Sequence, residues 1–82
     1  MAGINFINQL ISSGCIKGKV LACGTMCDKK KTKYMIVEFG RRKHYVLYDY
    51  GADLQFSKDI MPNDMVYINK VDDYTAIIEK CE

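Results

Sequence analysis

The sequence predicts a mainly β protein, a small barrel of five or six short strands that follows a short N-terminal amphipathic helix. Three observations support this fold class. Residues after Cys15 alternate between apolar and polar, segments rich in β-formers recur about every ten residues, and turn residues separate these segments. At 82 residues with 49% hydrophobic content, the chain is long enough for one domain and too short for two. We therefore expect a helix in residues 1–13 and a barrel domain in residues 14–82.

The helix is predicted because apolar residues in GINFINQLISSG recur at helical spacing. Ile4, Ile7 and Ile11 form one stripe, and polar residues occupy the other side. Gly14 predicts the end of the helix, since glycine adopts the left-handed conformation at a helix C-terminus without a Cβ penalty. A helix this short is marginal alone and must dock on other elements. We expect it to cap the open end of the barrel.

Six strands are expected after the helix, at residues 15–23, 34–39, 44–50, 52–56, 65–71 and 74–79. Gly18 indicates a bulge in the first strand, and the lysine-rich residues 24–33 form an exposed hairpin loop. The second and third strands form a central hairpin across a tight glycine-containing turn. In this hairpin we expect Val37 and Val46 to be buried.

The charges of the chain are unevenly distributed. From Asp28 to His44, seven basic side chains accompany two acidic ones, which gives this segment a net charge of +5. The rest of the chain carries −3, although the whole chain carries only +2. Such segregation attracts an anionic partner. The alternative is a solvated hairpin whose lysines discourage edge-to-edge pairing of strands.

Our first hypothesis is a non-catalytic module that binds nucleic acid, preferably single-stranded. The residues predicted to bind it are Lys29, Lys30, Lys31, Lys33, Tyr34, Arg41, Arg42, Lys43 and Tyr45. The basic side chains neutralise phosphates, and the two tyrosines offer faces on which bases stack. For both tyrosines, an ordinary place in the core or sheet is the alternative, because alternation alone does not tell which face is inward.

The second hypothesis is a protein-interaction module. A basic hairpin on a small domain can clamp an acidic peptide or a larger protein, with the charges acting on association rate and specificity. Tyr45, Tyr48 and Tyr50 would then form the anchor region. The N-terminal helix and an exposed edge strand also leave a homodimer as an option.

The cysteines Cys15, Cys23, Cys27 and Cys81 are predicted to be free thiols. The N-terminal segment lacks the features of a secretory signal, so we expect an intracellular protein, cytoplasmic or nuclear, with reduced thiols. Zinc sites favour closer cysteine pairs than Cys23 and Cys27, and His44 is the only histidine. A four-cysteine site stays an alternative if the termini meet. We predict no metal and no cofactor.

The sequence predicts neither an enzyme nor a membrane protein. It contains no close cysteine–histidine pairing, no phosphate-binding glycine loop and no carboxylate pair whose spacing implies shared chemistry. Asp72 and Asp73 are better explained as a hairpin turn. No apolar run reaches the roughly 20 residues that a spanning helix needs.

Four segments carry a resemblance to a known family, and they read GKVLA at 18–22, YMIV at 34–37, KHYVLYDYG at 43–51 and KDI at 58–60. Over about residues 15–60 this pattern resembles the SH3-like barrel of Tudor domains. The resemblance implies an aromatic cage for a methylated lysine or arginine. Tyr34 and Tyr48 would be its walls, and Asp49 or its neighbour would supply the anionic edge. Two positions after Asp49 depart from the family pattern, because Tyr50 replaces the second aspartate of the turn and Ala52 replaces an aromatic residue. Cys23 and Gly24 depart from the family pattern, which has an aromatic wall there.

The rival fold is the five-stranded oligonucleotide-binding (OB) barrel. It also has a long hairpin after its first strand, and residues 62–67, PNDMVY, resemble the turn that opens its late strands. This resemblance implies single-strand binding through a basic groove with stacking aromatic residues. The sequence leaves both barrels open.

Overall fold

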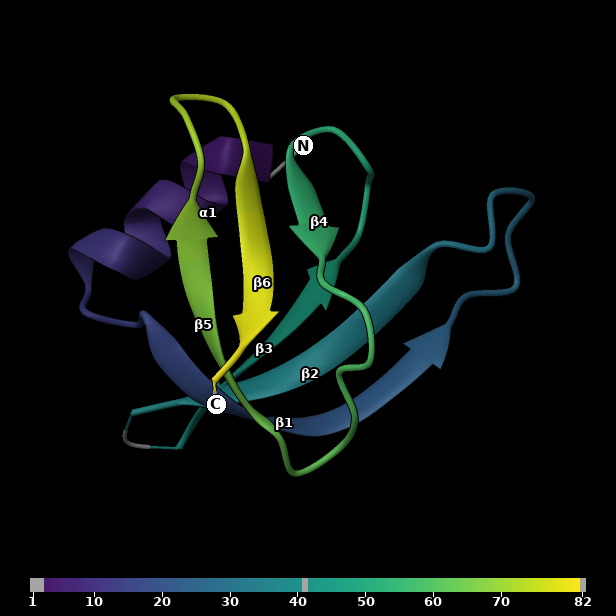
Figure 1. Ribbon diagram of the computed structural model, residues 1–82, viewed down its shortest axis with the longest axis horizontal. Coiled ribbons are helices and arrows are strands. Elements are labelled where there is room, and N and C mark those ends of the chain that lie inside the picture. The colour runs from purple at the N-terminus through teal and green to yellow at the C-terminus, as the bar shows by residue number, and fades with distance from the viewer. Residues whose placement is uncertain (1–2, 41, 82) are drawn as a thin grey trace.

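The computed structural model describes residues 3–40 and 42–81 and confirms the mainly β fold with one short N-terminal helix (Figure 1). In chain order its elements are α1 (Gly3–Ser12), β1 (Lys17–Thr25), β2 (Lys33–Phe39), β3 (Lys43–Tyr48), β4 (Leu54–Phe56), β5 (Met65–Lys70) and β6 (Ala76–Lys80). The six expected strands are all present, with ends that differ by a few residues from the predicted ones.

The described strands form one six-stranded sheet in the order β3-β2-β1-β5-β6-β4. Neighbouring strands are antiparallel, except that β4 runs parallel to β6. The sheet is open, because no pairing joins β3 to β4 at its two edges within the described residues. Only residues 49–53 connect these edge strands, and five residues span at most about 18 Å. The two edges are therefore held close, and the sheet is strongly curved.

The helix α1 ends as predicted. Gly14 has a φ of +79°, Cys15 N donates to Leu10 O at 2.8 Å, and Gly14 N donates to Ile11 O at 3.0 Å. This pair of bonds is the Schellman motif, which satisfies carbonyls that the helix would leave unpaired. Ile7 and Leu10 are buried in the core that all six strands share. The helix thus closes part of the core, as a short helix must if it is to be stable.

The alternation along β2 separates an inner from an outer side of the sheet. Met35, Val37 and Phe39 are buried, whereas the residues between them are only half-buried. On β3, Leu47 is buried and Val46 is 45% exposed. The expectation that Val46 is a core residue is therefore wrong, because successive side chains of a strand point to opposite faces and β3 turns Leu47 inward.

The irregularity of β1 lies at Leu21, where the register with β2 shifts, and not at Gly18. Gly18 has a different role. A Cβ built there would lie 2.6 Å from Val37 Cγ1 and 2.7 Å from Glu38 O, so only glycine lets β2 approach this closely. Opposite the bulge, Val20 N donates to Asp64 O at 2.9 Å and Asn63 N donates to Val20 O at 2.7 Å. The bulge thus fastens the β4–β5 connection to β1.

Candidate ligand-binding face

The outer sides of β1, β2 and β3 form a continuous surface, which we call the outer face. Its side chains lie in rows across the three strands, because the register places them directly opposite one another. The rows are Gly24, Tyr34 and Tyr48, then Ala22, Ile36 and Val46, then Lys19, Glu38 and His44. An aromatic row, an apolar row and a charged row thus follow one another from the β1–β2 loop towards the β2–β3 turn.

The aromatic row is placed by a glycine. An ideal Cβ at Gly24 would lie 2.6 Å from the ring of Tyr34, so the ring covers the backbone of β1. Tyr48 lies opposite Tyr34, and its ring centroid is 5.9 Å from that of Tyr50, which is 49% exposed. Three tyrosines therefore gather at the end of the outer face that is nearest the lysine-rich loop.

Tyr45 has a different position. Its ring is half-buried on the inner side of β3, 5.8 Å from the ring of Phe6 and 5.9 Å from that of Phe39. These contacts attach α1 to the sheet through aromatic packing. Tyr45 therefore belongs to the core and is separated from the three tyrosines of the outer face, although the sequence placed it among the base-stacking residues.

The β1–β2 loop holds its lysines outward by means of Asp28. The carboxylate of Asp28 accepts hydrogen bonds from Thr32 N at 2.9 Å and from Thr32 Oγ1 at 2.8 Å. Lys31 adopts a left-handed φ of +49°, and its N–H donates to Asp28 O. The loop is thus a defined turn, and its lysines are exposed.

Acid should loosen this loop. The hydrogen bonds from Thr32 hold the pKa of Asp28 below its ordinary value of 3.8. Because the folded pKa is the lower one, the carboxylate stabilises the turn above the unfolded pKa, and this contribution is lost as pH falls through the folded value.

We expect the amide of Thr32 to exchange faster in Asp28→Ala than in the wild type at neutral pH, with little change in melting temperature. Hydrogen exchange measured by NMR checks this, and unchanged protection of Thr32 would contradict it.

The basic segment of the sequence is divided in the structure. Lys29, Lys30 and Lys31 lie in the loop before β2, whereas Arg42 and Lys43 lie at the turn after it, on the other side of the molecule (Figure 1). Arg41 lies outside the described residues. At about 3.3 Å per residue, the seven residues of β2 separate the two groups by roughly 20 Å. They are two basic sites at the two ends of the outer face.

At the β2–β3 turn, Glu38 pairs with a histidine, and neither Arg42 nor Lys43 forms an ion pair with a described residue. His44 Nε2 lies 2.8 Å from Glu38 Oε2, and the register places Lys19 on the other side of Glu38. At the loop end, no lysine from Lys29 to Lys33 forms an ion pair with a described residue. The lysines of the loop end, which form no ion pair with a described residue, therefore lie beside the tyrosines.

Lys30, Lys31 and Lys33 line a hollow of about 330 Å³ together with Thr32, Asp49, Tyr50 and Gly51. Its far wall is the break between β3 and β4. There Asp49 accepts hydrogen bonds from Gly51 N at 2.9 Å and from Phe56 N at 3.0 Å. Asp49 thus uses its carboxylate to close the connection between the strands. Each carboxylate oxygen thus accepts one backbone N–H, and the side chain is held in place by the turn that it closes.

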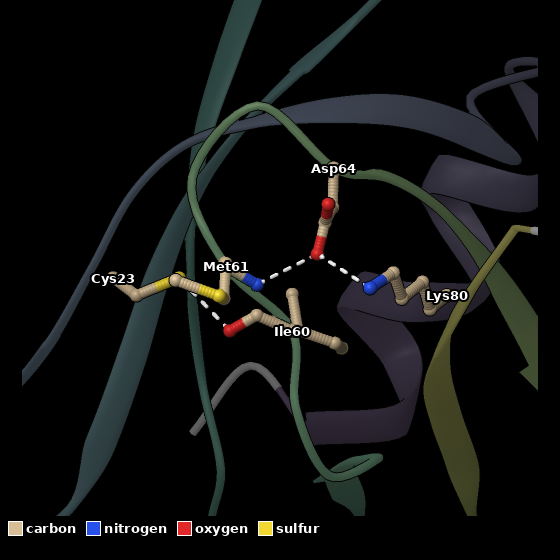
Figure 2. Close-up of polar contacts among 5 residues, drawn as sticks. All are labelled: Cys23, Ile60, Met61, Asp64 and Lys80. Atoms are coloured by element: carbon tan, nitrogen blue, oxygen red, sulfur yellow. Dashed lines mark hydrogen bonds and ion pairs between the residues drawn. The ribbon is translucent and has the colours of Figure 1, made fainter.

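A second polar cluster joins β1, the β4–β5 connection and β6 (Figure 2). The carboxylate of Asp64 accepts a hydrogen bond from Met61 N at 2.8 Å and lies 3.3 Å from Lys80 Nζ. The Met61 hydrogen bond and Lys80 together hold the pKa of Asp64 below 3.8. This cluster fixes the turn after β4 and is a structural feature.

Cys23 faces the same cluster, with its Sγ 3.9 Å from Ile60 O (Figure 2). Although the residue as a whole is exposed, desolvation of its sulfur and the nearby Asp64 carboxylate raise the pKa of the thiol. A raised pKa keeps the sulfur protonated and a poor nucleophile at neutral pH. Cys15, Cys27 and Cys81 are also free thiols. Within residues 3–40 and 42–81, no three potential metal ligands come together.

Comparison with known proteins gave no match to a family model, to a curated protein or to a solved structure. The described part of the chain also contains no helix that is long and apolar enough to cross a membrane.

Proposed function

We propose that this chain is a non-catalytic module that binds single-stranded nucleic acid on the outer face of β1, β2 and β3. One observation carries the proposal: the three outward tyrosines, Tyr34, Tyr48 and Tyr50, lie at the same end of this face as the unpaired lysines. Tyr50 is exposed, and Tyr34 and Tyr48 are half-buried. Such outward rings offer stacking surfaces to unpaired bases, and adjacent lysines neutralise the phosphates between them.

The arrangement of strands also supports the proposal. If β3 and β4 are counted as one strand interrupted at residues 49–53, five strands remain, and the lysine-rich loop follows the first of them. In oligonucleotide-binding barrels, the face of the second and third strands and the loop between the first and second strands contact the ligand. In this chain, Tyr34 and Tyr48 lie on the second and third strands, and Lys29, Lys30 and Lys31 lie in the loop between the first and second, which supports the proposal.

The length of the outer face sets the size of the ligand. The roughly 20 Å between the lysine loop and Arg42 corresponds to about four nucleotides of an extended strand, the lower end of the range for such barrels. A strand that stacks on the tyrosines would reach Arg42 and Lys43 only with its far end. These two residues would therefore contribute to binding of longer strands and little to binding of very short ones.

The charge beside the tyrosines opposes the cage hypothesis drawn from Tudor domains. A methylated lysine or arginine carries a positive charge, which Lys30, Lys31 and Lys33 would repel. An anionic ligand suits this end of the face better. Among anions, we favour a single strand because its unpaired bases can stack on the tyrosine rings while its phosphates meet the lysines.

The proposal is tested with two matched tyrosine variants. Tyr50→Ala removes an exposed ring from the proposed site, and Tyr74→Ala removes a ring that is 75% exposed in the β5–β6 connection, outside the outer face of β1, β2 and β3. Stacking is worth about 1–3 kcal/mol per base, so Tyr50→Ala should weaken binding of a labelled decathymidylate by roughly 5- to 150-fold in Kd. Tyr74→Ala should leave it unchanged. Fluorescence anisotropy measures both.

Anisotropy titrations with a single strand, a duplex and an acidic peptide distinguish between the proposed ligands. Wild-type protein should prefer the single strand over a duplex, and its log affinity should fall linearly with log salt. Binding of a poly-glutamate peptide but of no oligonucleotide would overturn the proposal in favour of a protein partner. Equal loss in Tyr50→Ala and Tyr74→Ala would remove the outer face from the site.

A further inference from the structure

We propose that the lysine-lined hollow is a preformed subsite for one phosphate group of the bound strand. The base beside that phosphate would then stack on Tyr50. This inference rests on the proposed function and adds a particular contact to it. The hollow has three lysines and an exposed aromatic ring around about 330 Å³, and the Thr32 hydroxyl in its lining already donates to Asp28. That volume is at the lower end of the range of about 300–1,000 Å³ for ligand sites.

The near wall of the hollow is preorganised by the loop. Asp28 binds both the N–H and the hydroxyl of Thr32, and the left-handed turn at Lys31 directs the chain back towards β2. Met26 N also donates to Thr32 O at 2.8 Å, which closes the loop at its base. The lysines are thus anchored at their backbones, and only their side chains must be ordered when a ligand binds.

The far wall is equally fixed. Asp49 N donates to Lys33 O at 2.9 Å, so the break after β3 is joined to the start of β2. The Asp49 carboxylate holds Gly51 N and Phe56 N, and Gln55 Nε2 donates to Gly51 O at 2.7 Å. These bonds position Tyr50 beside Tyr48 at the rim of the hollow.

The charge of the hollow fits one phosphate. The lining contains three lysines and Asp49, and the carboxylate of Asp28 is bonded to Thr32 of the same lining, so the net charge around the hollow is about +1. No described carboxylate forms an ion pair with Lys30, Lys31 or Lys33. An anion bound there would gain charge-assisted hydrogen bonds from exposed lysines.

The loop contains its own control for the test. Lys29 carries the same charge in the same turn but does not line the hollow. Lys29→Ala, Lys31→Ala and Lys33→Ala therefore remove equal charge from almost the same place. If the hollow is a preformed subsite, Lys31→Ala and Lys33→Ala should each weaken binding of decathymidylate more than Lys29→Ala does, by at least about fivefold. A diffuse positive field predicts equal losses, and that result would overturn the subsite while leaving the proposed function intact.

Inorganic phosphate tests the subsite independently of any nucleic acid. In NMR spectra of the wild type, phosphate should shift the amides of Lys31, Thr32 and Tyr50. Sodium sulfate of equal ionic strength, an anion of similar shape, should shift the same amides. Sodium chloride, the control for salt, should not. In Lys31→Ala these shifts should be lost. Shifts with phosphate in a protein that binds no oligonucleotide would show that the hollow binds phosphate and that the proposed function is wrong. No shift at these amides, or equal shifts with chloride, would overturn the subsite.

Discussion

Val37→Asp is expected to unfold the protein. Val37 is fully buried at the centre of β2, with Val20 directly opposite on β1, and the buried residues around it are apolar. An aspartate there would be an uncompensated charge in the core, which we expect to cost about 5 kcal/mol or more. A small domain has roughly 5–15 kcal/mol of total stability. Circular dichroism should therefore show loss of the cooperative thermal transition.

Val46→Asp is the matched variant for this prediction. Val46 lies on the neighbouring strand, one position along in the pairing, but its side chain is on the outer face and 45% exposed. The same substitution should leave the protein folded, because water still solvates the new carboxylate. It should also weaken single-strand binding by placing a negative charge on the proposed site. A folded Val37→Asp protein, or an unfolded Val46→Asp protein, would contradict the assignment of inner and outer sides.

Reversal of the three lysines of the hollow should have the largest effect on binding. In a Lys30→Glu, Lys31→Glu and Lys33→Glu variant, attraction to phosphate becomes repulsion beside the stacking tyrosines. We expect decathymidylate affinity to fall by about 100-fold or more at low salt, and the slope of log affinity against log salt to become smaller. The fold should be retained, since exposed charges contribute little to stability. Anisotropy titrations at three salt concentrations, with circular dichroism, measure both effects.

The opposite end of the outer face provides the comparison for this variant. Arg42→Gln with Lys43→Gln removes two charges about 20 Å away from the hollow. This double variant should weaken binding of decathymidylate modestly and should leave binding of a trinucleotide unchanged. If it weakened both ligands as strongly as reversal of the three lysines does, the long-range field of the whole basic segment would explain binding better than a site beside the tyrosines.

Much of the fold follows from local patterns. Gly14 ends α1 because a left-handed glycine satisfies the last carbonyls, and that requirement is visible in the sequence. The strands also follow from period-two alternation and turn residues. Whether the sheet closes into a barrel does not follow from local patterns. Whether β3 pairs with β4 depends on the geometry of residues 49–53, where Asp49 binds the backbone of Gly51 and Phe56 in place of a continued strand.

The candidate site shows where sequence patterns lose information. Alternation gives two faces for β3 but does not say which is inner, so Val46 was expected inside and Tyr45 was grouped with the stacking residues. The contact between Tyr45 and Phe6 of α1 decides the matter, and it joins residues far apart in the chain. The basic segment likewise looks like one cluster in the sequence, although β2 lies between its two halves. Tyr50 was expected as an anchor, but its place beside the lysines depends on the break after β3.

The most direct test of the account is to map the site by NMR, adding unlabelled decathymidylate to isotopically labelled wild-type protein. We expect the largest amide shifts at Tyr34, Tyr48 and Tyr50 and in the loop from Lys30 to Lys33, with smaller shifts at Arg42 and Lys43. The β5–β6 connection around Tyr74 should not respond. Shifts centred on Tyr74, or no shifts at low salt, would contradict the central claim that the outer face of β1, β2 and β3 binds a single strand.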